Sequence, residues 1–296
     1  MAYTVKTFDA IIDELDETHS WLQEVLQLPD GAGRLGEIQT EIARIKDLVE
    51  SGIAEEELFR QVDQVTAYHS WIDALGFVRI WQGLSGLSDQ KLPRRLLRRA
   101  NRGSLSPEQE SLDDSDARNV FFQLEYAADL STKGIKIRGF DDVEFEFEGT
   151  LYLAECKRLW SDRPRAVQRN IDKAASQLVR HLDAVRGKRA RGLVVIALES
   201  IAGLKSALPM EAPVAIEADV IGYTRRVAGA FMDVYGESLV GLNGRIIAAV
   251  IVGKMPIHTL SDNTFGPAFI PTIVPLVPRG SMDYRRLRRL ARTLNA

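Results

Sequence analysis

The sequence predicts a protein of the α+β or α/β class, with an N-terminal helical bundle, an α/β core and extra C-terminal α and β elements. Two observations predict this. Apolar residues recur every three or four positions through residues 5–76, which is the period of an α-helix. Residues 142–147 alternate between acidic and apolar side chains, which is the period of a β-strand. The length of 296 residues suits two domains, which we place at 1–82 (helical) and 117–296 (α/β), joined by a linker over 83–116.

The helical region contains three apolar seams, over residues 8–26, 35–49 and 58–72. Pro29-Asp30-Gly31 and Ser51-Gly52 provide the turns between them. Helices with such seams pack as antiparallel hairpins or coiled coils. The seams can therefore bury one another in one bundle, or they can form the interface of a homo-oligomer such as a dimer. A protein partner on this surface is a further alternative.

The core is expected to run in the order helix, three strands, helix, strand. In the second strand, Val143 and Phe145 share one face while Asp142 and Glu144 share the other. Pro164 opens an amphipathic helix, since proline is favoured in the first helical turn. The expected elements are a helix at 117–130, strands at 134–138, 142–147 and 151–157, a tight turn at 148–150, the helix from 164, and a strand at 193–198. After these we expect a helix at 215–237, a strand at 246–252, a proline-marked edge strand or loop at 267–278, and a basic helix at 283–294.

Acidic and basic residues near the end of the third expected strand suggest a catalytic site. Glu155-Cys156-Lys157 follows Asp142 by 13 residues, and Asp142 opens the neighbouring antiparallel strand. Glu155 and Lys157 are two apart, so they face one side of the sheet while Cys156 faces the other. Two such carboxylates can hold one Mg²⁺, which prefers oxygen ligands and keeps several waters. Lys157 can then orient or help to deprotonate an attacking water.

This pattern resembles the PD-(D/E)XK nuclease superfamily, the restriction-endonuclease-like fold, over about residues 115–200. The resemblance implies hydrolysis of a phosphodiester bond with Mg²⁺, for which Mn²⁺ can substitute. It implies Asp142 and Glu155 as metal ligands, with the backbone carbonyl of Cys156 as a third. The Pro-Asp of the family name is absent, because Phe140 and Asp141 precede Asp142, so Asp141 stays an alternative ligand.

The resemblance also implies two supporting residues on helices. Glu125 corresponds to a helical glutamate that lies near or in the metal site. Its apolar neighbours make a buried carboxylate that needs a partner, a proton or a metal, although a surface position is the alternative. Gln177 corresponds to a glutamine that approaches the site, and Lys173 and His181 lie four residues to either side of it on one helical face. Glu144, which shares the strand face of Asp142, is a further alternative member.

Charge is distributed unevenly along the chain. Residues 1–75 hold 5 Lys/Arg and 16 Asp/Glu, a net of −11, whereas the remainder holds 33 and 25, a net of +8. Residues 157–191 alone hold 11 Lys/Arg against three Asp. We expect contact with the phosphate backbone of nucleic acid here, against the alternative of a solvated helix face. The residues expected to make this contact are Arg158, Arg163, Arg165, Arg169 and Lys173.

The function expected from the sequence is that of a Mg²⁺-dependent nuclease, a DNA endonuclease more than an RNA-directed one, of the kind used in restriction or anti-phage defence. The alternative is a non-catalytic or partner-gated module that binds nucleic acid or oligomerises. No other cofactor is expected, because the Gly-x-Gly-x-x-Gly at 31–36 follows a helix rather than a strand. A single cysteine, no signal-peptide core and no run of 18 apolar residues predict a cytoplasmic protein without a membrane span.

Overall fold

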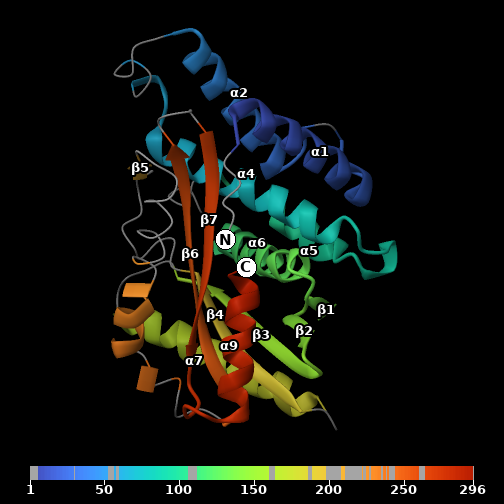
Figure 1. Cartoon of the computed structure of the whole chain (residues 1–296). Helices are drawn as coiled ribbons and strands as arrows, with labels where there is room; N and C mark the ends of the chain where they lie inside the picture. The colour runs from blue at the N-terminus through green and yellow to red at the C-terminus, as the bar shows by residue number, and fades with distance from the viewer. Residues whose placement is uncertain are drawn as a thin grey trace.

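The computed structural model shows a mixed α/β protein in which helices pack on both faces of one sheet (Figure 1). The N-terminal helices lie at one end of the sheet. Among the described helices, none combines the length and the apolar character that a membrane crossing requires. The structure describes residues 6–29, 31–52, 57, 60–105, 112–159, 164–185, 189–197, 208–210, 222, 225–226, 228–234, 236–237, 239, 244–259 and 264–295.

The N-terminal region is helical, as its apolar seams predict. The first two seams form α1 (Phe8–Leu26) and α2 (Arg34–Glu50). The third is only partly described, and its second half lies in α4 (Gln64–Leu84), which continues well past the last seam residue. The segment expected to be a linker, 83–116, contains the short helix α5 (Arg94–Ala100), preceded by the 3₁₀ turn η1 (Asp89–Lys91).

Helix α6 (Leu112–Thr132) belongs to two cores at once. Phe121 and Leu124 on one face are buried with the apolar residues of α1, α2, α4 and α5. Phe122 and Tyr126 on the opposite face are buried against the sheet. Residues 120–130 are buried at every position except the half-buried Gln123, as expected of a helix that lies between two layers. The helical region therefore packs directly on the α/β region through α6.

The sheet has the order β1-β2-β3-β4-β6-β5. β7 also pairs with β6, antiparallel, from Ala248 to Thr259 of β6. β1, β2 and β3 are antiparallel neighbours, and β3, β4 and β6 are parallel. The turn between β2 and β3 has positive φ at Glu148 (47°) and Gly149 (70°), which matches the twist of a tight hairpin. The strands are β1 (Lys136–Gly139), β2 (Val143–Phe147), β3 (Thr150–Arg158), β4 (Ala190–Ala197), β5 (Leu208–Met210), β6 (Ile246–Thr259) and β7 (Thr264–Pro275).

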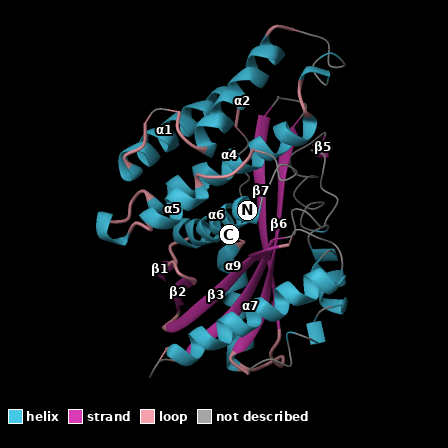
Figure 2. Ribbon diagram, turned by 180° about the vertical axis from the view of Figure 1, so that it is seen from behind, coloured by secondary structure: helices cyan, strands magenta, loops and turns pink. Residues whose placement is uncertain are grey.

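The helices that follow the strands cover opposite faces of the sheet. α7 (Pro164–Ala184) packs on the face of Leu153 and Val194, and it crosses the strands in the view of Figure 2. α9 (Met282–Leu294) packs with α6 on the other face. The order helix, three strands, helix, strand is thus confirmed between residues 112 and 197.

The C-terminal elements differ from expectation mainly in length. β6 is longer than the buried strand expected at 246–252. The proline-marked segment forms β7 as far as Pro275, which pairs with β6 alone among the described strands, as prolines require. The basic terminal helix is confirmed as α9. Much of the helix expected at 215–237 falls outside the described residues.

The close crossing of α4 and α6 provides a stability test. A Cβ added at Gly83 would lie 2.5 Å from the carbonyl oxygen of Ala128 and 2.7 Å from its Cβ. Neither atom can rotate away, so Gly83→Ala must shift one helix, and we expect it to lower the free energy of unfolding by about 1–3 kcal/mol. The matched control is Gly86→Ala, whose added Cβ meets open space. Urea denaturation compares the two, and equal midpoints would contradict the tight packing.

Candidate metal site

Three side chains with metal-binding atoms converge on the α7 side of the sheet. Atoms of Asp142, Glu155 and His181 that can ligate a metal all lie within 4.8 Å of one another. The two carboxylates are buried, at 7% and 6% exposure, whereas the histidine side chain is about half exposed. The three residues lie just before β2, within β3 and in the last turn of α7. The cluster is therefore buried on its strand side and open on its helix side.

Strand register explains why the two carboxylates meet. Val143 pairs with Ala154, so the next step of the antiparallel ladder places Asp142 opposite Glu155. The apolar partners Val143 and Ala154 face the core on the α6 side. Their immediate neighbours must then face the α7 side, because side chains alternate along a strand. One acidic residue next to a core-facing apolar residue in each strand is therefore sufficient to form the carboxylate pair.

Lys157 and His181 each contact one carboxylate of the pair. Nζ of Lys157 lies 2.5 Å from Oε1 of Glu155, and Nδ1 of His181 is in close contact with Oδ2 of Asp142. Burial nonetheless raises the pKa of Glu155 to about 7, helped by the hydrogen bond that protonated Glu155 can donate to the Asp142 carboxylate, although Lys157 acts in the opposite direction. The site thus favours a proton on Glu155, and a bound cation would favour the ionised form instead.

The donor set fits a hard divalent cation. Two carboxylates from different strands are the usual protein contribution to a Mg²⁺ or Mn²⁺ site. The imidazole of His181 suits Mn²⁺ better than Mg²⁺, because nitrogen is the softer ligand. Two side chains thus provide oxygen donors, and the exposed side of the cluster leaves room for water and substrate.

Gln177 lies one helical turn before His181 on α7. Its side chain is half-buried, and its Oε1 is buried without a hydrogen-bond partner among the described residues. A buried acceptor without a partner is costly, so this oxygen is suited to a bound water or ligand. The thiol of Cys156 lies on the opposite face of β3, where burial raises its pKa well above the usual value. A ligand role for the Cys156 carbonyl stays a prediction.

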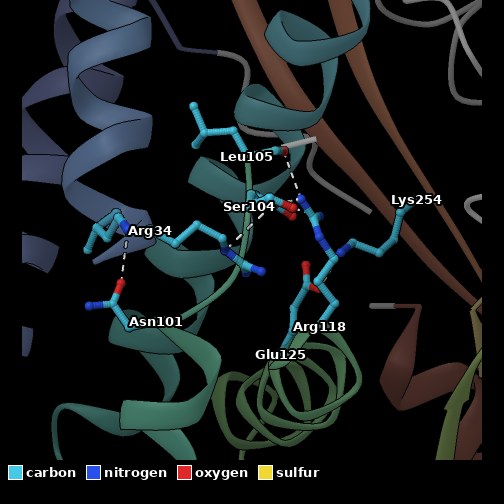
Figure 3. Close-up of polar contacts among 9 residues, drawn as sticks. Arg34, Asn101, Ser104, Leu105, Arg118, Glu125 and Lys254 are labelled. Atoms are coloured by element: carbon cyan, nitrogen blue, oxygen red, sulfur yellow. Dashed lines mark hydrogen bonds and ion pairs between the residues drawn. The ribbon is translucent and has the colours of Figure 1, made fainter. Parts of the chain in front are cut away.

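Glu125 lies outside this cluster. It projects from α6, which covers the other face of the sheet, and it is completely buried. Its Oε1 accepts a hydrogen bond from Arg79 at 2.6 Å. Its Oε2 lies 2.6 Å from Nζ of Lys254, and Figure 3 labels Glu125 and Lys254. The buried carboxylate of Glu125 is thus paired with two cationic side chains, and it does not belong to the candidate metal site.

Asp141 and Glu144, the alternative acidic members of the site, lie outside the cluster. Asp141 is 91% exposed, and its nearest cation is Arg95 at 3.6 Å, so Asp142 rather than Asp141 belongs to the cluster. The carboxylate of Glu144 lies against Gly139 on the neighbouring strand. Among the described residues, neither the Asp141 nor the Glu144 side chain belongs to the cluster that contains Glu155 and His181.

The basic residues expected to contact nucleic acid fall into three groups. Arg165, Arg169 and Lys173 are exposed on α7. Arg158 is only 4% exposed and lies on the α6 side of β3, so it is unsuited to direct contact with a nucleic acid. Arg163 lies outside the described residues. The exposed charge therefore lies along α7, on the same face of the sheet as the carboxylate pair.

His181 is the member of the cluster to which the sequence analysis gives no metal role. The sequence feature that points to His181 is its spacing from Gln177, because residues four apart lie on the same helical face. Spacing alone does not say that the last turn of α7 reaches Asp142. That contact depends on how α7 crosses the strands.

Comparisons with protein-family models, with curated proteins and with solved structures found no match.

Metal binding distinguishes the two neighbouring aspartates. Asp142→Asn removes the negative charge of a buried member of the cluster and replaces one carboxylate oxygen with an NH₂ group, so we expect the affinity for Mn²⁺ to fall by about tenfold or more. Asp141→Asn changes an exposed carboxylate outside the cluster and should leave the affinity within about twofold of the original. Isothermal titration calorimetry measures both. Equal losses in the two variants would contradict the assignment of Asp142.

The pKa of Glu155 predicts a pH dependence of stability in metal-free protein. The pKa rises from 4.5 to about 7 on folding, so the contribution of the protonated group is fully present below about pH 4.5 and is lost as the pH rises through 7. The loss is on the order of 3 kcal/mol. Glu155→Gln cannot titrate and should lack this decrease. Urea unfolding in EDTA at pH 5 and pH 8 tests this, and identical pH dependences in both proteins would refute it.

Proposed function

We propose that this protein is a Mg²⁺-dependent nuclease of the PD-(D/E)XK type that cleaves DNA. The observation that carries the proposal is the buried carboxylate pair, Asp142 and Glu155, held on adjacent strands with Lys157 on the same face as Glu155. The element order and the antiparallel hairpin followed by a parallel strand are compatible with the restriction-endonuclease-like fold. A role in restriction or anti-phage defence is an analogy at the level of fold.

The residues of the cluster divide the chemistry of phosphodiester hydrolysis between them. Asp142 and Glu155 would hold the cation, which neutralises phosphate charge and lowers the pKa of a bound water. Lys157, which is partly exposed, can orient the attacking water and contact the phosphate. His181 holds the Asp142 carboxylate in place and lies at the open side of the site, where it can also act as a ligand. Such positioning contributes to the rate by fixing the geometry of attack.

The substrate is inferred from charge. Arg165, Arg169 and Lys173 are exposed on the helix that carries His181, and cations at such spacings follow a phosphate backbone. The strongly acidic N-terminal helices disfavour the same polyanion, so a substrate is directed to the sheet end of the molecule. Dimerisation, which we also propose for the helical region, would use its outer surface, because the apolar seams of α1 and α2 are buried within the chain.

Cleavage of supercoiled plasmid, linear duplex and single-stranded DNA in Mg²⁺, Mn²⁺ or EDTA tests the proposal. We expect metal-dependent cleavage and a loss on the order of 10²-fold or more in Lys157→Ala, since this lysine assists the proton transfer. Lys136→Ala is the matched control, because Lys136 is exposed on β1 away from the cluster, and it should cleave within about twofold of the original rate. Cleavage that persists in EDTA, or that survives Lys157→Ala unchanged, would refute the assignment.

A further inference from the structure

A depression of about 370 Å³ is lined in part by Asp141, the residue that precedes Asp142 of the candidate metal site. It is formed where the helical region meets the sheet, between the start of α5 and the loop that joins β1 to β2. Its volume is within the range of roughly 300–1,000 Å³ in which proteins hold small ligands. The residues that line it are Leu92, Pro93, Arg94, Arg95, Leu96, Phe140 and Asp141.

The depression and the metal cluster share one loop. Phe140 and Asp141 line the depression, and the next residue, Asp142, is a member of the cluster. Gln123 of α6 holds this loop, because its side-chain amide donates hydrogen bonds to the carbonyl oxygens of Phe140 and Asp141, the latter at 3.1 Å. The Phe140 side chain packs against both the helical core and the sheet core. A group bound in the depression would therefore be held at a fixed distance from the metal.

The chemistry of the lining suits a nucleotide. Arg94 and Arg95 are exposed, and guanidinium groups bind phosphate through paired hydrogen bonds. Arg95 lies 3.6 Å from Asp141, but both side chains are mostly exposed, so this is a weak pair that a phosphate can replace. Leu92, Leu96 and Phe140 provide an apolar wall, and an aromatic ring is a stacking surface for a base.

We infer that this depression binds the nucleotide next to the scissile phosphodiester, with its phosphate on Arg94 and Arg95 and its base against Phe140. The inference rests on the proposed nuclease function and adds a substrate class to it. A base inside a duplex is stacked on its neighbours and cannot reach the ring of Phe140. The depression therefore selects unpaired DNA, such as a single strand or a frayed strand end.

The inference also gives the helical region a role at the site. α5 is anchored in the helical core by Leu96, Leu97 and Ala100, all buried. The segment expected to be a linker thus carries a helix whose first two arginines reach the loop of Asp141. The helical region would complete the substrate site as well as provide contacts between copies.

Binding of a fluorescently labelled pentathymidylate in EDTA tests the inference without any cleavage. We expect Arg94→Ala/Arg95→Ala to weaken binding at least fivefold, and to reduce the salt dependence of binding by about 0.7 for each lost phosphate contact. The matched control is Arg285→Ala/Arg288→Ala, which removes two exposed arginines from α9. α9 contacts the β2–β3 turn through Arg289 and Glu148, at the end of β3 away from Glu155. This control should bind within twofold of the original protein.

A second variant tests the stacking surface. Phe140→Leu keeps an apolar side chain in the two cores but removes the ring, so it should reduce quenching of a 2-aminopurine base in the same oligonucleotide. A fully paired duplex should show a smaller effect of both changes than the single strand. Unchanged single-strand binding in Arg94→Ala/Arg95→Ala would overturn the inference.

The outcomes separate this inference from the proposed function. Metal-dependent cleavage by the original protein, together with unchanged oligonucleotide binding in Arg94→Ala/Arg95→Ala, would retain the nuclease and refute the nucleotide subsite. Arginine-dependent binding without cleavage in any metal would retain the subsite and refute the nuclease. No binding of the oligonucleotide by the original protein would overturn the nucleotide subsite, and the nuclease would still be decided by the cleavage assay.

Discussion

The candidate site depends on two carboxylates that the fold holds close together and away from water. Asp142 and Glu155 are each less than a tenth exposed, and their oxygens share one small volume with the imidazole of His181. Like charges at this distance repel, and burial adds a desolvation penalty, so the arrangement is costly without protons or a cation. The fold nonetheless imposes it, because the β2–β3 register that buries Val143 and Ala154 also places their acidic neighbours opposite each other. A cation is the most direct way to offset this cost.

A second set of buried charges fixes the helical region on the sheet. Glu125 joins α6 to α4 through Arg79 and to β6 through Lys254, and Arg118 of α6 pairs with Asp73 of α4 at 2.8 Å. Removing one partner of such a pair typically costs about 3–5 kcal/mol, since the other charge is left buried. Two ion-pair sets and a shared apolar core thus resist separation of the two regions. α5 is buried in the same helical core, and its Arg95 lies 3.6 Å from Asp141.

Much of the core could be predicted from local sequence. The acidic–apolar alternation of β2, the turn at Glu148-Gly149 and the opening of α7 at Pro164 each follow from one or two residues. The same alternation favours Asp142 over Asp141 as the buried carboxylate. It also predicts that Arg158 shares the face of Cys156 rather than that of Lys157, so its burial away from the site follows from strand geometry.

The remaining features depend on contacts between distant residues. The sequence shows that Glu125 needs a partner, but Arg79 and Lys254 lie far from it along the chain and are brought there by the packing of α4 and β6. His181 meets Asp142 only because of the angle at which α7 crosses the sheet. The depression at Phe140 requires α5 to pack on α6, which the basic composition of the segment does not reveal. Propensity and periodicity describe single elements, whereas these sites arise between elements.

The most direct test of the central claim is the position of a bound ion. Crystals of the protein grown with Mn²⁺ would show the metal by its anomalous scattering. The account predicts one strong peak between Asp142 and Glu155, about 2.1 Å from a carboxylate oxygen of each. A structure with Mn²⁺ bound elsewhere, or with the two carboxylates still paired to Lys157 and His181 at saturating Mn²⁺, would contradict it.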